Sequence, residues 1–178
     1  RAPITAAPLN LSGPRIGATY VAGEEATLLR EKLGISYPVV TQFGWQFEHR
    51  FFEQIGGFTG INEFIFLLGG LDQAALLPSA SWLVGVRTVG GAEVGAGPVL
   101  ALTPMLNAID EGRFGMGKGR SLSGIGFAVA AGVTIRSGDV NFPFNLALVR
   151  SDSGFRVTLL TGFNLQAAPK SAPRAQSP

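Results

Sequence analysis

The sequence predicts an all-β fold: a closed, eight-stranded, antiparallel up-and-down barrel that crosses a membrane, with short helical turns in its long loops. First, apolar and polar residues alternate with period two over eight segments, which gives each strand one apolar face. Second, the mean hydropathy is +0.30 and only 15% of residues are charged, against roughly 25% in soluble domains. Third, every charge-free stretch is too short, or too rich in Pro and Gly, for a spanning helix of about 18 or more apolar residues. A hydrophobic chain without such a helix is expected to cross as strands.

The alternation is clearest in the strand expected over residues 39–52. From Thr41 to Phe51, the odd positions are Thr, Phe, Trp, Phe, His and Phe, and the even positions are Gln, Gly, Gln, Glu and Arg. We expect the aromatic face to meet lipid and the polar face to point into the barrel. In chain order, the strands are expected at about residues 14–21, 39–52, 61–71, 81–89, 92–102, 123–136, 140–149 and 155–165.

The other seven strands repeat this arrangement. Strand by strand, the residues expected to face lipid are Ile16, Ala18 and Tyr20; Phe64, Phe66 and Leu68; Trp82, Val84 and Val86; Val94, Ala96, Pro98, Leu100 and Leu102; Ile125, Phe127, Val129, Ala131, Val133 and Ile135; Phe142, Phe144, Leu146 and Leu148; and Phe155, Val157, Leu159, Phe163 and Leu165. Because proline lacks the N–H that a strand ladder needs, we expect a bulge or an open seam at Pro98 and at Pro143.

The connections are short at one rim of the predicted barrel and longer at the other, as in membrane barrels. The short links are residues 56–60, 90–91 and 137–139, and the longest are residues 22–38 and 103–122. Each long link is expected to hold a helical turn, over residues 24–33 with Gly34 as its stop and over residues 103–112. This arrangement places both chain ends at the short-turn rim.

The chain divides into three parts by composition. Residues 1–13 are expected to be an extended N-terminal arm, residues 14–165 the barrel domain, and residues 166–178 a disordered tail rich in Pro and Ala. The sequence starts at Arg1 with neither Met nor an apolar signal core, so we expect that a signal peptide has been removed.

Charged residues on the inward faces form the strongest candidate site. We expect a structural network that fills the lumen, with Arg15 beside Glu48, Arg50 beside Glu63, and Arg87 beside both Glu63 and Glu93, because an unpaired charge inside a narrow barrel is costly. A polar relay or a gated pore is the alternative. The predicted members are Arg15, Glu48, Arg50, Glu63, Arg87, Glu93 and Arg136.

Aromatic residues cluster toward both ends of the predicted strands, as at the two interfaces of a membrane. An ordinary aromatic protein core is the alternative. The expected interfacial aromatics are Tyr20, Tyr37, Trp82 and Phe155 near the long-loop rim, and Phe51, Phe52, Phe142 and Phe163 near the short-turn rim.

Eight alternating strands, unequal loops and a last strand ending in Leu159-Leu160-Thr161-Gly162-Phe163-Asn164-Leu165 resemble the small eight-stranded outer-membrane β-barrels of the OmpA and OmpX types. The resemblance is architectural and covers about residues 14–165. It implies a Gram-negative outer membrane with both termini in the periplasm, and it transfers no functional residue.

We therefore expect a non-enzymatic structural or binding component of the bacterial envelope, which acts through its extracellular loops. Membrane lipid is the expected partner. Lipopolysaccharide head groups are a further candidate at Lys118 and Arg120, and other envelope proteins are candidate partners of the loops and tail. Two alternatives stay open: a subunit of a filament or membrane assembly whose apolar outer face packs on protein, and a passage for small hydrophobic compounds, which would need an apolar lumen near Leu67, Leu71, Val99 and Leu160.

The composition points away from several other functions. With no Cys and one His, the chain offers no thiolate or His-cluster metal site, and no cofactor is expected. The single histidine, His49, is followed two residues later by Phe51 rather than by a nucleophile. The net charge of +2 comes from scattered basic residues, so nucleic acid is not an expected partner.

Overall fold

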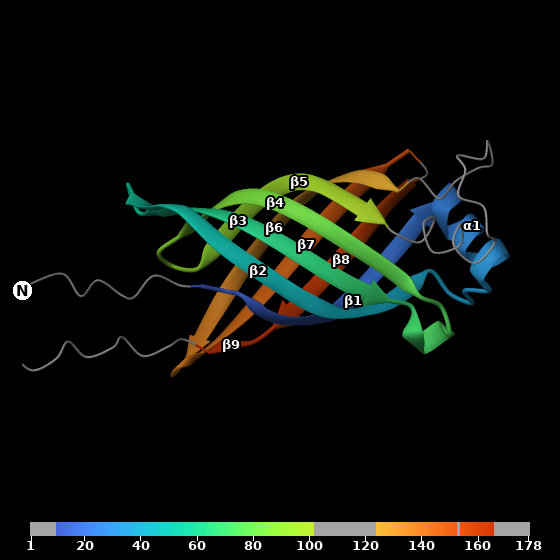
Figure 1. Ribbon diagram of the computed structural model, residues 1–178, viewed down its shortest axis with the longest axis horizontal. Helices are drawn as coiled ribbons and strands as arrows, with labels where there is room; N and C mark the ends of the chain where they lie inside the picture. The colour runs from blue at the N-terminus through green and yellow to red at the C-terminus, as the bar shows by residue number, and fades with distance from the viewer. Residues whose placement is uncertain (1–9, 102–123, 153, 166–178) are drawn as a thin grey trace, which may run out of the picture.

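The computed structural model describes residues 10–101, 124–152 and 154–165, and these form one closed barrel (Figure 1). Its strands, in chain order, are β1 (Gly13–Gly23), β2 (Val39–Ile55), β3 (Phe58–Gly69), β4 (Leu77–Thr88), β5 (Ala92–Ala101), β6 (Ile125–Ser137), β7 (Val140–Ser151), β8 (Gly154–Gly162) and β9 (Asn164–Leu165). The helix α1 (Glu24–Leu33) follows β1, and the short 3-10 helix η1 (Leu71–Gln73) follows β3.

Each strand from β1 to β7 pairs antiparallel with the next, and β8 pairs back with β1 to close the ring. Arg15 lies opposite Gly44 of β2 and also opposite Gly162 of β8. The two-residue β9 continues the line of β8 and pairs with β7. The predicted fold class, a closed eight-stranded antiparallel barrel, is therefore confirmed.

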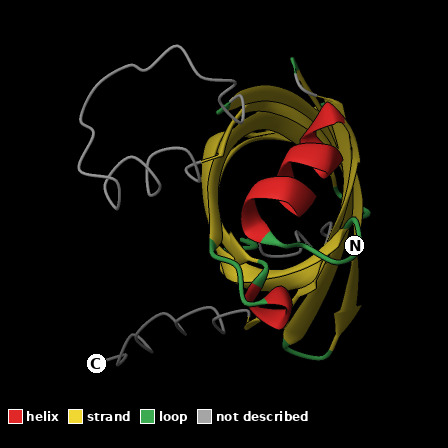
Figure 2. Ribbon diagram, turned by 90° about the vertical axis from the view of Figure 1, so that its right-hand side faces the viewer, coloured by secondary structure: helices red, strands yellow, loops and turns green. Residues whose placement is uncertain are grey.

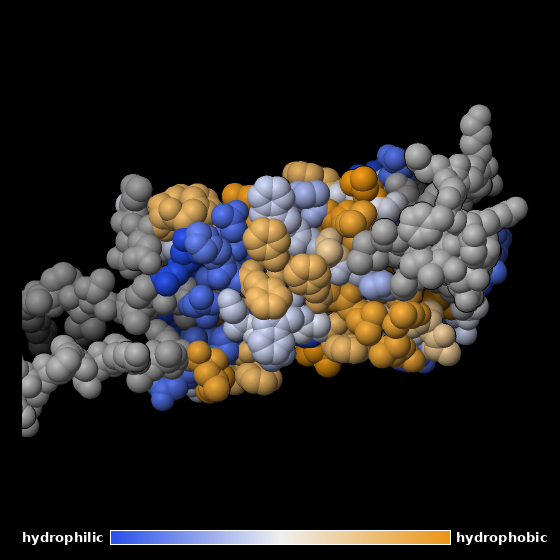
Figure 3. Space-filling view, viewed as in Figure 1, coloured by the Kyte–Doolittle hydropathy of each residue, from blue (hydrophilic) through white to orange (hydrophobic). Residues whose placement is uncertain are grey.

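The side chains alternate between lumen and exterior as the sequence predicts. Phe43, Phe66 and Phe127 are 49%, 50% and 56% exposed, whereas Arg15 and Arg87 are each 3% exposed. Apolar side chains gather on the outer wall toward the long-loop end, and hydrophilic ones gather toward the short-turn end on the face shown in Figure 3. An apolar exterior around an interior that contains ionic residues is typical of a barrel that spans a membrane.

Several boundaries differ from prediction because strand pairing continues past the clear alternation. The fourth strand begins at Leu77 rather than at residue 81, since Leu77 pairs with Gly69. β2 extends to Ile55 through two shifts of register after Arg50. The helix predicted over residues 24–33 is confirmed, with Gly34 in the left-handed conformation at its end. Leu102, predicted to face lipid, and the helical turn predicted over residues 103–112 lie outside the described residues.

The two prolines that were expected to disturb a ladder, Pro98 and Pro143, coincide with a local lapse of pairing rather than with a bulge. Between β4 and β5, pairing stops after Ser81–Val99 and resumes in the same register at Val84–Ala96, on either side of Pro98. Pro143 pairs with Thr134 of β6 and lies where β7 passes from β8 to β9. Each proline thus sits where one ladder is interrupted, as its missing N–H requires.

Candidate functional site: the filled lumen and its long-loop mouth

Arg87 is the centre of a buried ionic network in the short-turn half of the lumen. Its guanidinium donates two hydrogen bonds to Glu48, at 2.9 and 2.6 Å, and one to Glu93 at 2.7 Å. The carboxylate of Glu63 lies 3.7 Å from the same guanidinium. These four side chains come from β2, β3, β4 and β5, so the network ties half of the barrel wall together.

Amide side chains extend this network to both sides. Gln46 donates to Glu63 at 2.5 Å and accepts a hydrogen bond of 3.0 Å from Arg15 on β1. Asn145 of β7 donates to the free oxygen of Glu93 at 2.8 Å. Arg15 also donates to Asn164 at 3.3 Å. Hydrogen bonds, together with the ion pair between Arg87 and Glu63, therefore cross the lumen from β7 to β1.

The structure brings together some of the predicted pairs. Arg87 contacts Glu63 and Glu93 as expected, but Arg15 donates its hydrogen bonds to Gln46, Asn164 and backbone carbonyls rather than to Glu48. Arg50 is half-buried on the inward face of β2, and its pairing with Glu63 stays a prediction. Arg136 has inward parity but is exposed, because it lies one residue from the end of β6 at the short-turn rim.

The sequence analysis missed the amide members Gln46, Asn145 and Asn164. All three have inward parity on their strands, and that signal was available. Inward amides are expected beside such charges, because a buried carboxylate or guanidinium needs several hydrogen-bond partners.

An apolar layer closes the middle of the lumen above the ionic network. Its buried members are Ile65, Leu67, Leu83, Val99, Ala128, Val149 and Leu160. Leu67, Val99 and Leu160 are therefore together, as the hydrophobic-passage alternative requires. Leu71 is not among them: it lies in η1, outside the barrel wall, and is 53% exposed.

The N-terminal segment occupies the short-turn opening. Leu11 is completely buried, and its carbonyl accepts a hydrogen bond from Arg15. Ser12 accepts a hydrogen bond of 2.9 Å from the backbone N–H of Glu48, and its carbonyl accepts one from Asn164. The arm predicted over residues 1–13 thus contributes, in its described part, a side chain that fills the bottom of the lumen.

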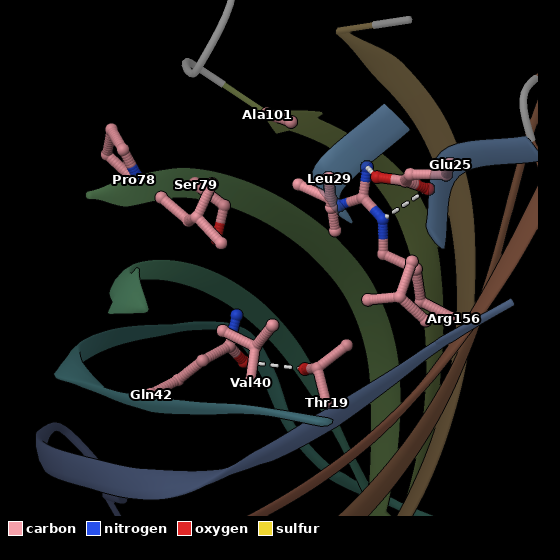
Figure 4. A pocket seen from close by; sticks show the side chains of 11 residues that line it. Thr19, Glu25, Leu29, Val40, Gln42, Pro78, Ser79, Ala101 and Arg156 are labelled. Carbon is pink, nitrogen blue, oxygen red and sulfur yellow. Dashed lines mark hydrogen bonds and ion pairs between the residues drawn. The ribbon is translucent and has the colours of Figure 1, made fainter. Parts of the chain in front are cut away.

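Helix α1 lies across the opposite, long-loop mouth, as the view along the barrel in Figure 2 shows. Leu28 and Leu29 pack into a buried cluster with Val21, Ile35 and Val40. Glu25, in the first turn of the helix, forms a two-point ion pair with Arg156 of β8, with distances of 2.6 and 3.0 Å (Figure 4). The helix is therefore fixed by both apolar packing and a largely buried ion pair.

A small cavity remains beneath α1, with a volume of about 40 Å³. Thr19, Gln42 and Arg156 contribute its polar groups, and Leu29 and Val40 contribute apolar ones. Thr19 donates to Gln42 at 2.7 Å and also lies 2.7 Å from the hydroxyl of Thr158. A space of this size holds a few water molecules at most.

The long-loop rim carries an exposed hydrogen-bonded clamp between two loops. The Asp72 carboxylate accepts hydrogen bonds from Thr41 at 2.5 Å and from the Tyr37 phenol at 2.8 Å. These hydrogen bonds, from Thr41 first and then from Tyr37, lower the pKa of Asp72 below its ordinary value. The hydrogen bond to Asp72 raises the pKa of Tyr37. Gln73 adds hydrogen bonds to the backbone of Ser36, Tyr37 and Val39.

The predicted interfacial aromatics lie on the outer wall, with one misplaced in height. Tyr20, Tyr37 and Phe155 are exposed near the long-loop end, and Phe51, Phe142 and Phe163 are exposed near the short-turn end, with Phe52 half-buried there. Trp82 is not at a rim. It lies halfway along β4 opposite Phe64, because β4 starts four residues earlier than predicted.

His49 is exposed on the outward face of β2 beside Phe51. Lys118 and Arg120 lie outside the described residues. Within the described part of the chain, no three His, Asp or Glu side chains are grouped to hold a metal ion. In that same part, no helix is long and apolar enough to cross a membrane.

No protein-family model matches the sequence, and no curated protein matches it significantly. Among solved structures, the chain is similar to the outer membrane protein Ail of Yersinia pestis, whose backbone structure was determined in a phospholipid bilayer nanodisc. The identity is 14%, over 87% of this chain and 98% of Ail, with a TM-score of 0.45. The fold assignment rests on this chain's own strand pairing: a closed eight-stranded barrel with an apolar exterior and a filled interior.

Proposed function

We propose that this protein is a non-enzymatic component of the bacterial outer membrane, which has a structural or binding role at its long-loop end. The proposal rests on the contrast between the outer face of the barrel wall and the lumen. Large apolar side chains are exposed around the outside, and the lumen is filled at every described level, by Leu11, the Arg87 network, the apolar layer and α1. A closed barrel of this kind is suited to an outer membrane.

The filled interior favours a structural or binding role over transport. A solute would have to displace α1, then the buried leucines, then an ionic network whose members hydrogen-bond one another. Breaking one partner of such a network leaves an uncompensated buried charge, which costs about 3–5 kcal/mol. The passage for hydrophobic compounds is therefore the weaker alternative.

The orientation is part of the proposal. β1 begins, and β9 ends, at the short-turn rim, which we assign to the periplasm after removal of a signal peptide. The mouth closed by α1 then faces the outside. Contacts of Lys118 and Arg120 with lipopolysaccharide, and contacts of loops and tail with other envelope proteins, belong to this proposal as candidate interactions.

The orientation can be tested because the chain contains no cysteine. Single-cysteine variants at Glu31, exposed on α1, and at Asp139, exposed in the short turn, are expressed behind a cleavable signal peptide and treated with a bulky PEG-maleimide. We expect recovery in the outer-membrane fraction, labelling of Glu31→Cys in intact cells, and labelling of Asp139→Cys only after permeabilisation. The opposite labelling pattern would reverse the orientation.

The assembly-subunit alternative makes a different prediction about solubility. A transmembrane barrel needs detergent or lipid to stay dispersed, since its outer wall is apolar. Size-exclusion chromatography with and without detergent decides between them. A protein that stays monodisperse in plain buffer, or that forms ordered polymers there, would contradict the membrane proposal.

A further inference from the structure

An apolar groove of about 350 Å³ lies on the outer wall, where the ladder between β4 and β5 lapses. The floor of the groove includes the small side chains of Ala80 and Pro98, and larger side chains project outward around them. The large side chains that line it are Phe64, Phe66, Trp82, Leu100 and Ile125. Its volume falls within the range of about 300–1,000 Å³ that is typical of small-molecule sites.

We propose that this groove binds one acyl chain of a membrane lipid from the leaflet on the long-loop side. The proposal rests on the membrane-spanning part of the proposed function. It goes beyond general lipid contact, because it assigns a defined site to one stretch of the wall.

The position of the groove identifies its occupant. It is continuous with the apolar outer wall, which is exposed on every strand of the barrel, so its surroundings in a membrane are hydrocarbon. Leu100 and Ile125 lie at its end near the long-loop rim, and Phe64 and Trp82 lie halfway down the wall. An acyl chain that enters from the long-loop side would therefore run down past Ala80 and end against the aromatic rings.

The aromatic wall of the groove is ordered by ring stacking. The rings of Phe64 and Trp82 are parallel within 2°, with centroids 6.0 Å apart. Such stacking favours one fixed arrangement of the two rings. A fixed flat wall beside small residues gives a shape that a flexible methylene chain can fill.

The two tryptophans of the chain make the proposal testable. Trp45 and Trp82 are each 47% exposed. On the two neighbouring sides of β3, Trp45 of β2 pairs with Phe66, and Trp82 of β4 pairs with Phe64. They therefore lie at similar heights on the outer wall, but only Trp82 lines the groove. Trp45→Phe leaves Trp82 as the reporter, and Trp82→Phe leaves Trp45 as the matched control.

Each variant is reconstituted into vesicles of unlabelled phosphatidylcholine mixed with phosphatidylcholine brominated midway along its acyl chains. Bromine quenches tryptophan fluorescence on contact. We expect half-quenching of Trp82 at a several-fold lower mole fraction of brominated lipid than half-quenching of Trp45. Equal curves for the two reporters would overturn the groove site, and weaker quenching of Trp82 would also overturn it, since protein would then cover the groove.

Filling the groove supplies the second measurement. Ala80→Phe in the Trp45→Phe background should bring the quenching of Trp82 to the level of Trp45. Ala18→Phe, on the outward face of β1 away from the groove, should leave it unchanged. If neither tryptophan is quenched by any brominated lipid, the membrane-spanning proposal itself fails, which is a separate outcome from equal quenching.

Discussion

At the scale of single residues, Arg87 is the buried cation on which the ionic network depends. It is 3% exposed, and three carboxylates surround it. The barrel tolerates this arrangement because amides add hydrogen bonds to two of these carboxylates: Gln46 donates to the Glu63 oxygen nearest Arg87, and Asn145 donates to the second oxygen of Glu93. The consequence is that the network is stable only as a whole.

Replacing Arg87 by Met should therefore destabilise the barrel by about 3–5 kcal/mol, because the carboxylates lose their main counter-charge. Urea unfolding in detergent micelles, followed by tryptophan fluorescence, measures the change. Arg150→Met is the matched control, since Arg150 is exposed on the outer wall. Adding Glu48→Gln and Glu93→Gln to the Arg87 variant should restore part of the lost stability. A loss no larger than that of Arg150→Met would contradict the network's role.

The clamp of Tyr37 and Asp72 gives a pH dependence at the long-loop rim. The pKa of Asp72 is lowered by hydrogen bonds from Thr41 and Tyr37, so the carboxylate's contribution is present above the ordinary aspartate pKa and is lost as pH falls through the lowered value. The pKa of Tyr37 is raised by its hydrogen bond to Asp72, so the phenol's contribution is present below the ordinary tyrosine pKa and is lost as pH rises through the raised value.

This dependence can be measured because the chain has two tyrosines. In a Tyr20→Phe background, phenolate absorbance reports Tyr37 alone. We expect Asp72→Asn to lower the titration midpoint toward the ordinary tyrosine pKa of about 10. Asp139→Asn, at the opposite rim, should leave the midpoint where it was. An unchanged midpoint in the Asp72 variant would show that the clamp does not form.

At the scale of elements, glycine on the inward face permits close approach of neighbouring strands. A Cβ atom on Gly44 of β2 would lie 1.8 Å from the carbonyl oxygen of Phe66 on β3, which is backbone and cannot move aside cheaply. At Gly95 of β5 the nearest atom, the carbonyl oxygen of Val84, is 3.4 Å away. The two glycines share an inward position but differ in the room available.

Gly44→Ala is therefore expected to destabilise the barrel by at least about 1–3 kcal/mol, because the strands must separate to admit the methyl group. Gly95→Ala should change the free energy of unfolding by less than about 1 kcal/mol. The same urea titration compares them. Equal losses would mean that inward glycines matter for a reason other than strand separation.

The elements also show where sequence reasoning reached its limit. Period-two alternation locates all eight strands and their faces, and Glu24–Leu33 was identified by its helix formers and the following Gly34. The start of β4 and the break before β9 were not predictable, because they depend on which residue lies opposite on the neighbouring strand. Trp82 was misplaced in height for that reason.

At the scale of the whole molecule, the decisive property is the depth of the apolar wall. Val129 and Ile135 are both 57% exposed on the outward face of β6. Val129 lies midway along its strand, whereas Ile135 lies near the short turn. Arginine at a lipid-facing site is costly at mid-membrane and tolerated near the interface.

Val129→Arg should accordingly cost about 2–4 kcal/mol, and Ile135→Arg about 0–1 kcal/mol, when unfolding is measured in lipid vesicles. Similar costs for the two variants would mean that the wall does not span a bilayer. The comparison is sharper than one with the neighbouring Ala128, because Ala128 is buried in the apolar layer and a large side chain there fails through packing alone.

The sequence by itself determined the strands, the face that each side chain takes and the signs of the buried charges, because a period of two is a local property of the backbone. Only the tertiary structure decided that Gln46 links Arg15 to Glu63, that Leu11 fills the bottom of the lumen and that α1 closes its top. It alone also formed the groove beside Trp82. These features join residues far apart in the chain, and their geometry depends on the register between neighbouring strands rather than on any local pattern.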